Sequence, residues 1–421
     1  MVDVSLRRVR PGDVGRQDRP AVTPTALADA SKIVEDVRNE GEPAVRRYAE
    51  RFGERAPGEP LILGPGEMDN ALASVDGSTK SVLTRAADRI RVFAEAQLEA
   101  ISPIDIEVPG GRAGHTVEPV AAAGCYAPGG RYPLPSSALM TAVTARVAGC
   151  SRVIVASPAA YPVTLAAAAV AGADAFFAVG GAHGIAALAY GYAGFEPVDV
   201  IAGPGNAWVT AAKQLVSGVV GIDMLAGPSE LLVLADDSAN PDLVAADLLA
   251  QAEHDDEAAA YLVCLSEEFA ASVDGALRQR LETLGTAATA RNGLLHGFAC
   301  VCDSLDEALA VTDRVAPEHL EVLTQDPEGV ASRVRNAGGV FIGSNAAEVL
   351  GDYGAGPNHT LPTGGTARFR AGLSVASFLR LRTWLRIDDV EAGAGLASDA
   401  VALAELEGLE AHAASARLRT T

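Results

Sequence analysis

The chain has 421 residues, of which 49% are hydrophobic and 21% are charged. A chain of this length and composition is expected to form two or more globular units with a substantial core. It carries 33 Lys and Arg against 54 Asp and Glu, a formal net charge of −21. This negative balance argues against nucleic acid or an anionic membrane surface as the main partner.

Neither the N-terminus nor the longest uncharged stretch predicts export or a membrane span. The first 20 residues lack the apolar run of a secretory signal. Residues 153–173 contain Pro158 and Pro162 and are interpreted as strand, loop and helix. The cysteines are an odd number spread along the chain, Cys125, Cys150, Cys264, Cys300 and Cys302. We interpret them as reduced, buried thiols and expect a cytoplasmic protein that does not bind membranes.

The first 120 residues are predicted to be helical. Residues 23–52 form two amphipathic segments interrupted at Gly41–Pro43, and a longer helix begins at Ser81. Beyond residue 150 the pattern changes, because apolar runs at 153, 175 and 198 are each followed by a short helical stretch. This spacing is typical of successive βαβ units whose strands are buried on both faces.

A second series of apolar runs begins at residues 231, 261, 298, 320 and 340. The chain therefore reads as two α/β domains, followed from about residue 374 by a helical tail. No G-x-G in the sequence has a third glycine three residues later, and no lysine follows a G-x-x-x-x-G. The standard dinucleotide and triphosphate loops are therefore missing, and any nucleotide must bind in another way.

Three histidines are candidates for chemistry. His254 lies near a predicted helix end with Gln251 on the same helical face, and His319 follows Glu318 just before a predicted strand. His359 ends a segment rich in Gly and Pro. Each could simply be a capping or solvated side chain. Together they could also supply nitrogen and oxygen ligands of a metal or catalytic site assembled from separate loops.

Seven blocks of sequence carry a more specific signal. They are GCYAPGGRYPLPSSALMTAVTARVAGC, GPGNAWVTAAKQ, GIDMLAGPSELLVLAD, DLLAQAEHDDE, APEHLEV, GDYGAGPNHTLPTGG and the terminal LEGLEAH. In order and spacing they resemble the histidinol dehydrogenases, from about residue 25 to the C-terminus. The resemblance implies a zinc- and NAD-dependent enzyme that oxidises L-histidinol through the aldehyde to L-histidine, reducing two NAD⁺.

The resemblance also implies an α/β architecture of two incomplete Rossmann-like, parallel-sheet domains with helical N- and C-terminal extensions. We expect an N-terminal arm at 1–22 and a catalytic, zinc-holding domain made of 23–125 and 231–373. The NAD-binding domain is expected at 126–230. Residues 374–421 would form a helical tail that enters the active site of the partner subunit in a homodimer.

Site residues carried over from the family fall into four groups. Zinc would be held by Gln251, His254, Asp352 and His412. Glu318 and His319 match the acid–base pair, in which His319 accepts the alcohol proton and Glu318 activates the water that hydrates the aldehyde. The substrate would touch the four zinc ligands, His319, Ser229 and Glu407. NAD would touch Tyr126, His183 and Asn206.

Two departures from the family pattern leave alternatives open. His183 stands where the family commonly has a glutamine that contacts NAD, and Arg131 lies in a variant GGRYPL segment. Related dehydrogenases keep the zinc site but oxidise other small polar alcohols, such as sulfonated propanediols. A non-catalytic metabolite-binding protein is a further alternative, although it would predict loss of catalytic or zinc residues. Cys125 is interpreted as a packing residue.

Overall fold

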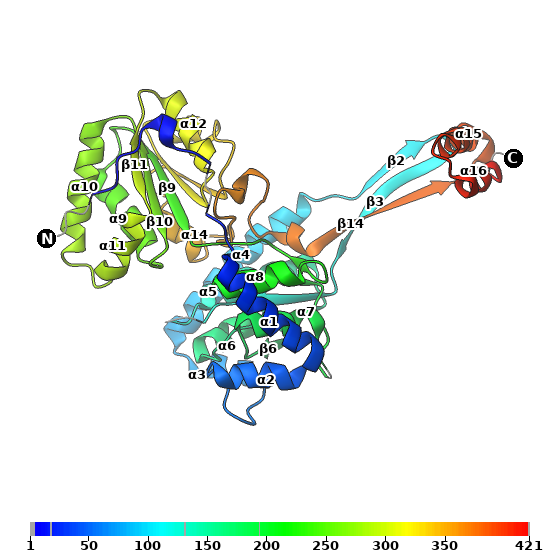
Figure 1. Ribbon diagram of the computed structural model, residues 1–421, viewed down its shortest axis with the longest axis horizontal. Coiled ribbons are helices and arrows are strands. Elements are labelled where there is room, and N and C mark those ends of the chain that lie inside the picture. Colours follow the sequence, from blue (N-terminus) through cyan, green and yellow to red (C-terminus); the bar gives the residue numbers. More distant parts are fainter. Residues whose placement is uncertain (1–4, 17–18, 130–131, 193, 420–421) are drawn as a thin grey trace.

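Three β-sheets organise the computed structural model, which describes residues 5–16, 19–129, 132–192 and 194–419. Two of them are essentially parallel and form the body of the molecule (Figure 1). The third is antiparallel and forms an arm that projects from the body. The expected α/β class with parallel sheets is confirmed.

The first sheet has six strands in the order β1-β6-β5-β4-β7-β8. Only β1 runs antiparallel to its neighbour. The strands are β1 (Ile62–Leu63), β4 (Ala122–Tyr126), β5 (Arg152–Ala156), β6 (Ala175–Phe177), β7 (Val200–Ala202) and β8 (Gly221–Ile222). Within β5, Val153 and Val155 face one core and Ile154 the other. Both faces are therefore buried, as the continuous apolar runs predict.

Helices cover both faces of this sheet. One core contains residues of α3 (Pro65–Ser74), α4 (Gly77–Glu99), α5 (Pro135–Ala148) and α6 (Pro162–Val170). The opposite core contains residues of α1 (Pro24–Glu40), α2 (Glu42–Arg51), α7 (Gly181–Tyr190) and α8 (Ala207–Val216). Apart from 104–119, which form strands of the arm, residues 23–125 therefore pack in the first-sheet domain. The expectation that they join 231–373 was wrong, because the apolar faces of α1 to α4 are buried against β4, β5 and β6 and their helices.

The second sheet is parallel and has the order β11-β10-β9-β12-β13. Its strands are β9 (Glu230–Ala235), β10 (Ala259–Cys264), β11 (Phe298–Val301), β12 (His319–Leu323) and β13 (Gly339–Ile342). One face is covered by α9 (Pro241–Ala252), α10 (Glu267–Leu281) and α11 (Ala287–Leu295). The other face is covered by α12 (Leu305–Val315) and α13 (Pro327–Ala331). A five-residue helix, α14 (Glu348–Asp352), follows β13.

The N-terminal residues belong to this second domain. Leu6 and Val14 are buried in its two cores, and Arg8 forms a parallel bridge with Ala299 on the edge strand β11. The backbone N–H of Val9 donates to the carbonyl of Ala299 at 2.9 Å. A short 3₁₀ turn, η1 (Pro11–Asp13), follows. The segment thus crosses the edge of the second sheet before the chain enters α1.

The arm corrects two further expectations. It consists of β2 (Ile104–Val108), β3 (Gly111–Pro119) and β14 (Leu379–Ile387), with α15 (Val390–Leu406) and α16 (Glu410–Arg417) at its tip (Figure 1). The first 120 residues are therefore not all helical, and the tail begins with short 3₁₀ turns and a nine-residue strand. The helical expectation failed because β14 is stabilised by pairing with β3, more than 250 residues earlier in the chain.

Within the described residues, no helix is both long and apolar enough to cross a membrane. The cytoplasmic location stays a prediction. The five cysteines are all buried and unpaired, as expected.

A buried ion pair anchors the turn that follows β7. Lys213 on α8 is 2% exposed, and its ammonium group pairs with Asp223 and donates to the carbonyl of Gly203 at 3.0 Å. Asp223 in turn accepts a hydrogen bond from the backbone N–H of Gly203 at 2.7 Å. Because both charges are desolvated, removing one leaves the other uncompensated inside the protein.

We therefore expect Lys213→Met to lower the free energy of unfolding by about 3–5 kcal/mol. Lys213→Met combined with Asp223→Asn should lose less, because no buried charge is then left unpaired. Urea denaturation of the three proteins measures the difference. Equal losses in the single and double variants would contradict this account.

Candidate active site

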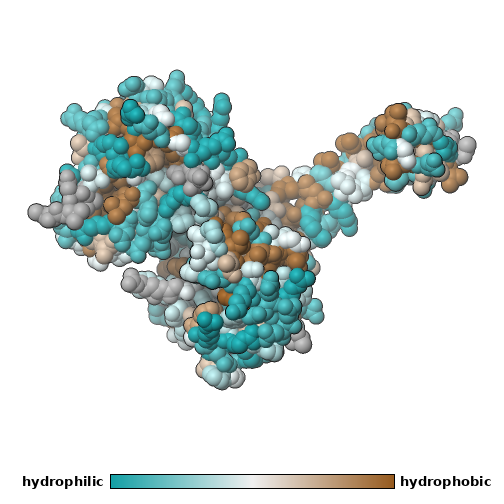
Figure 2. Space-filling model, viewed as in Figure 1, coloured by the Kyte–Doolittle hydropathy of each residue, from teal (hydrophilic) through white to brown (hydrophobic). Residues whose placement is uncertain are grey.

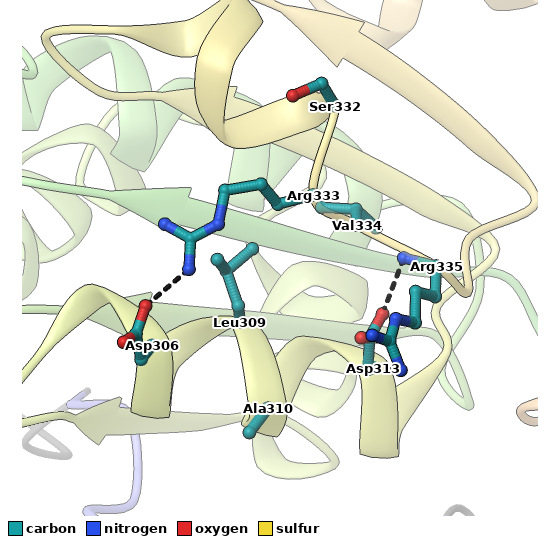
Figure 3. A pocket seen from close by; sticks show the side chains of 8 residues that line it. All are labelled: Asp306, Leu309, Ala310, Asp313, Ser332, Arg333, Val334 and Arg335. Atoms are coloured by element: carbon teal, nitrogen blue, oxygen red, sulfur yellow. Dashed lines mark hydrogen bonds and ion pairs between the residues drawn. The ribbon is translucent and has the colours of Figure 1, made fainter.

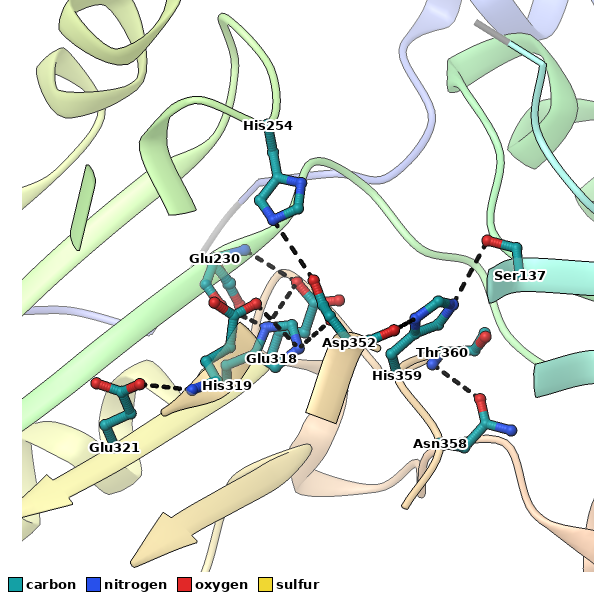
Figure 4. Close-up of polar contacts among 11 residues, drawn as sticks. Ser137, Glu230, His254, Glu318, His319, Glu321, Asp352, Asn358, His359 and Thr360 are labelled. Carbon is teal, nitrogen blue, oxygen red and sulfur yellow. Dashed lines mark hydrogen bonds and ion pairs between the residues drawn. The ribbon is translucent and has the colours of Figure 1, made fainter. Parts of the chain in front are cut away.

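Histidine and acidic side chains converge at the amino edge of the second sheet (Figure 4). Glu318 and His319 lie at the start of β12, and Glu230 begins the neighbouring strand β9. Helix α9 runs back to this edge, so that Gln251 in its last turn and His254 just beyond it arrive there too. Asp352 ends the short helix α14. The βαβ topology therefore collects residues more than 100 positions apart in the sequence.

The geometry of this cluster suits a metal ion. The Nε2 atom of His254 lies 3.6 Å from Oδ2 of Asp352. Ligand atoms of His254, Asp352 and Glu348 all lie within 4.8 Å of one another. One imidazole nitrogen and several carboxylate oxygens form a mixed donor set of the kind that zinc accepts.

The side chain of Gln251 supports the same conclusion. It is fully buried, and neither its amide oxygen nor its amide nitrogen has a hydrogen-bond partner. A buried amide without hydrogen-bond partners costs free energy. A bound ion next to Gln251 and His254 would supply the interaction that this amide lacks within the chain. Three of the four predicted zinc ligands, Gln251, His254 and Asp352, therefore lie in one region and fit a metal.

His319 is held in a defined orientation. Its Nδ1 lies 3.3 Å from the backbone carbonyl of Glu230, and a carbonyl can only accept a hydrogen bond. Nδ1 therefore carries the proton and donates, which leaves Nε2 as the free basic nitrogen. Nε2 faces the carboxylates of Glu348 at 3.8 Å and Asp352 at 4.0 Å. The ring thus presents its base toward the metal-type cluster.

Glu318 and His319 lie side by side, as the sequence predicts. Oε2 of Glu318 accepts a hydrogen bond from the backbone N–H of Glu230 at 2.9 Å and lies 3.6 Å from Nδ1 of His319. Both side chains are almost completely buried. His319, however, begins β12 rather than lying on an irregular loop, so the neighbouring strands β9 and β13 fix its backbone.

Burial shifts the acid–base behaviour of this cluster. Desolvation lowers the pKa of His319 to about 4, so that the imidazole is neutral at pH 7. Desolvation also raises the pKa of Glu318 well above its ordinary value, and the charges of Glu230, Asp352 and Glu348 raise it further. The pKa of Glu348 is raised to about 9 by burial and by Asp352 and other nearby carboxylates. At pH 7 a neutral proton acceptor, His319, therefore lies beside carboxyl groups whose protons burial retains.

Two acidic residues of the site were missed by the sequence analysis. Glu230 is 1% exposed and accepts a hydrogen bond from the backbone N–H of Gly364 at 3.0 Å. Glu348 is 1% exposed, and neither of its carboxylate oxygens has a hydrogen-bond partner. A signal existed for Glu230, because it stands at the head of an apolar strand run where a charge is rarely buried without a reason.

His359, whose role the sequence left open, connects the cluster with the first domain. Its Nδ1 lies 3.0 Å from the backbone carbonyl of Asp352, and its Nε2 lies 3.4 Å from the hydroxyl of Ser137 on α5 (Figure 4). Both ring nitrogens therefore have a partner. The arrangement supports the carbonyl end of α14, where Asp352 is located.

A cavity of about 720 Å³ brings together all three predicted NAD contacts, Tyr126, His183 and Asn206. They follow or end β4, β6 and β7, so the cavity opens at the carboxyl edge of the first sheet, where ligands of doubly wound folds bind. Lys32 and Arg51 also line it. Two cations beside a turn before a helix N-terminus suit an anionic, dinucleotide-sized ligand.

In the wall of this cavity, His183, which replaces the glutamine common in the family, forms defined contacts. The His183 ring is fully buried, and its Nε2 lies 2.9 Å from Oε2 of Glu54. The same carboxylate oxygen accepts a hydrogen bond from the backbone N–H of Gly180 at 3.0 Å. The hydroxyl oxygen of Tyr126 accepts a hydrogen bond from the backbone N–H of Gly181 at 3.1 Å. His183 therefore shares with Tyr126 the support of the glycine turn between β6 and α7. Asn206 is exposed and caps α8 through its Oδ1.

The remaining predicted residues lie elsewhere or carry other roles. Ser229 is half-buried immediately before Glu230. Glu407 and His412 are exposed on the arm tip and do not reach the cluster of their own chain. Arg131 lies outside the described residues. Cys125 is fully buried on β4 and burial raises the pKa of its thiol, which agrees with a packing role.

A second hollow, of about 510 Å³, contains none of the predicted site residues (Figure 3). It lies between α12 and residues 332–335 and is open to solvent. Two of its acidic groups already have partners, because Asp306 pairs with Arg333 and Asp313 accepts a hydrogen bond from the backbone N–H of Arg335. The cavity beside Tyr126 is therefore the better candidate for a cofactor.

Fold, cluster and cavity together define an α/β enzyme, and comparisons with known proteins identify its family. Residues 17–420 match the family model described as histidinol dehydrogenase. The chain is 44% identical over 410 residues to a histidinol dehydrogenase of Methanopyrus kandleri, covering 93% of this chain and 94% of that protein. It is 46% identical over 397 residues to that of Rhodospirillum rubrum, covering 92% and 91%.

A solved structure agrees. The crystal structure of histidinol dehydrogenase from Elizabethkingia anophelis superposes with a TM-score of 0.91 at 31% identity, covering 98% of each chain. The chain therefore belongs to the histidinol dehydrogenase family, oxidoreductases of histidine biosynthesis.

The buried neutral His319 makes a prediction about stability and pH. Between its ordinary pKa of 6.5 and the folded-state value of about 4, the unfolded chain binds a proton at this residue and the folded chain does not. Its contribution is therefore fully present above pH 6.5 and is lost as the pH falls. Relative to His319→Gln, the metal-free protein should lose about 3 kcal/mol of unfolding free energy from pH 7 to pH 4.

Denaturant titrations of both proteins across this range measure the difference. His115→Gln, on β3 of the arm, is the control for replacing a histidine outside the cluster. Parallel curves for wild type and His319→Gln would contradict the assignment.

Proposed function

We propose that the protein oxidises L-histidinol through L-histidinaldehyde to L-histidine, using one zinc ion per subunit and two NAD⁺. The observation that carries the proposal is the convergence of Gln251, His254 and Asp352 beside the Glu318–His319 pair. Residues predicted separately from the sequence meet there, in a family whose members are histidinol dehydrogenases. The ligand set mixes imidazole, amide and carboxylate and fits zinc.

Each part of the body has its own task in this proposal. The cavity beside Tyr126, His183 and Asn206 holds NAD, and Gln251, His254 and Asp352 hold zinc together with His412. Bound zinc would position the nitrogen atoms of the substrate and offset the negative charge around Glu318, while NAD⁺ accepts the hydride. Ser229 and Glu407 are assigned to substrate contacts.

His319 serves as the base of the first oxidation. Its Nε2 is unprotonated at pH 7 and faces the cluster, whereas its Nδ1–H is held by the carbonyl of Glu230. Nε2 can therefore take the proton of the alcohol hydroxyl as hydride leaves the same carbon. The carboxylate of Asp352, whose Oδ1 lies 4.0 Å from Nε2, is close enough to stabilise the imidazolium that forms.

Glu318 serves the second oxidation. Once ionised, it takes a proton from the water that adds to the aldehyde carbon, while His319 returns its proton to the carbonyl oxygen, which yields a hydrated aldehyde and leaves His319 neutral again. Loss of a second hydride from that carbon, with a hydroxyl proton passing to His319, gives the acid. The backbone N–H of Glu230 donates to Oε2 at 2.9 Å, so Oε1 is the oxygen assigned to take the proton from water.

The proposed homodimer explains the position of the tail. Glu407 and His412 are exposed at the end of an arm that extends away from the body (Figure 1). Apolar side chains gather along this arm (Figure 2), and several are exposed, including Ile106, Leu385 and Leu406. An exposed apolar surface of this kind favours association. The tail would supply Glu407 and His412 to the site of the partner subunit.

Substrate identity is tested by NADH yield. L-histidinol should give two NADH per molecule, and Glu407→Gln should lower kcat/KM for it, because Glu407 is assigned to the substrate amine. A sulfonated propanediol should be a poor substrate, since a carboxylate repels a sulfonate in a partly desolvated site. A higher kcat/KM for the sulfonated alcohol, or one NADH per histidinol, would favour the alternative dehydrogenase activity.

The swapped tail is tested by complementation. His254→Ala disables the body and His412→Ala disables the tail, so each variant alone should be inactive. If the tail crosses, a mixed dimer contains one intact site, and random mixing should restore about a quarter of wild-type activity. Mixing two batches of the same variant is the control. No recovery from dimers shown to have exchanged subunits would place both residues in one chain's own site.

A further inference from the structure

A buried glutamate outside the ligand set connects the elements that carry the site. Glu321 lies on β12 two residues beyond His319 and is 1% exposed. Its Oε1 accepts a hydrogen bond from the backbone N–H of Glu348 at 2.7 Å, at the first residue of α14. The residue before α14, Ala347, has no side chain that could cap the helix. Glu321 therefore supplies the cap from another element.

The second oxygen of Glu321 meets another acid. Oε2 has no ordinary donor, and the carboxyl group of Asp247 on α9 lies within hydrogen-bonding distance. Two carboxyl groups in contact must share a proton. Burial and the neighbouring Asp247 raise the pKa of Glu321 to about 8, and burial also raises the pKa of Asp247, against the opposing effects of its hydrogen bond with Glu321 and of Arg280. Protonated Glu321 thus donates to Asp247.

The position of Asp247 links this pair to the metal ligands. It lies four residues before Gln251, and therefore on the same face of α9. Glu321 is thereby joined to α9, which carries Gln251, and to α14, which ends at Asp352. Helix α14 has only five residues, so Asp352 lies about 6 Å along the helix axis from the residue that Glu321 anchors. A shift of the anchor moves Asp352 directly.

We propose that the Glu321–Asp247 carboxyl pair is a positioning device, which holds α9 and α14 against β12 so that Gln251 and Asp352 converge on one metal ion. The inference rests on the proposed metal function and adds two residues that touch neither metal nor substrate. Groups that orient metal ligands commonly change metal affinity 10- to 100-fold when they are removed. The pair acts through geometry, and its shared proton makes a neutral amide a good substitute for Glu321.

The test compares two substitutions of Glu321 in the full-length protein. Glu321→Gln keeps an acceptor for the N–H of Glu348 and a donor for Asp247, and its zinc dissociation constant should stay within about twofold of wild type. Glu321→Leu removes both bonds at similar volume and should raise the constant about 10- to 100-fold. Competition with a chromogenic chelator measures zinc affinity. The activity of Glu321→Leu, expressed as a fraction of wild-type activity, should be higher at saturating zinc than at limiting zinc.

A matched control separates positioning from general stability. Asp274 on α10 is also buried in the second domain, where it accepts the N–H of Leu6 at 3.0 Å and pairs with Arg8. Asp274→Leu should lower the melting temperature and leave zinc affinity unchanged. If Glu321→Leu does not fold, Asp247→Leu is tested in its place and should also raise the zinc dissociation constant. It removes the hydrogen bond that holds the side chain of Glu321 against α9.

The outcomes distinguish the inference from the function beneath it. Wild-type zinc affinity in Glu321→Leu, or an equal loss in Asp274→Leu, would overturn the positioning role and leave the proposed function standing. Loss of zinc in Glu321→Gln as large as in Glu321→Leu would also overturn it. A wild-type protein that binds no zinc would remove the proposed metal function, and the inference with it.

Discussion

Buried negative charge is the constraint around which this site is built. Glu230, Glu318 and Glu348 are almost fully buried beside Asp352, and desolvation raises the pKa of all three. Such a group of carboxyls is costly unless protons, N–H donors or a cation offset it. Backbone N–H groups serve Glu318 and Glu230, from Glu230 and Gly364 respectively. The charge that remains around Asp352 and Glu348 is what a bound dication would balance.

This constraint explains how the fold and the site depend on each other. A neutral His319 survives in the cluster because its Nδ1–H is paired with a carbonyl of the neighbouring strand, and that pairing exists only while β9 and β12 are in register. The arrangement of parallel strands therefore sets the tautomer of the proposed base. The first sheet, in contrast, has its cavity at the carboxyl ends of its strands.

The sequence predicted the two parallel sheets well and the arm poorly. Strands such as β5 and β9 are continuous apolar runs buried on both faces, which is a local signal. Strand β14 alternates apolar and polar residues, a pattern of period two that the helical interpretation overlooked, and it depends on a distant partner in β3. For the site, compact motifs revealed Glu318–His319 and Gln251–His254. Glu348 lies in an ordinary-looking segment, and only tertiary packing brings it to the cluster.

The two domains must face one another for the proposed hydride transfer, and one segment sets how they do so. Residues 352–363 begin at a predicted metal ligand and then contact the first domain repeatedly. Asn358 donates to the carbonyl of Met140 at 2.8 Å, and His359 lies beside Ser137 at 3.4 Å, both on α5. The hydroxyl of Thr363 accepts a hydrogen bond at 2.6 Å from the backbone N–H of Gly227, which lies in the segment between β8 and β9 that connects the two domains. Because His359 also holds the carbonyl of Asp352, the contacts that orient the domains are the same ones that place the ligand. In the proposed reaction, the backbone of this segment would therefore set the distance between a substrate at the cluster and a nicotinamide in the cavity.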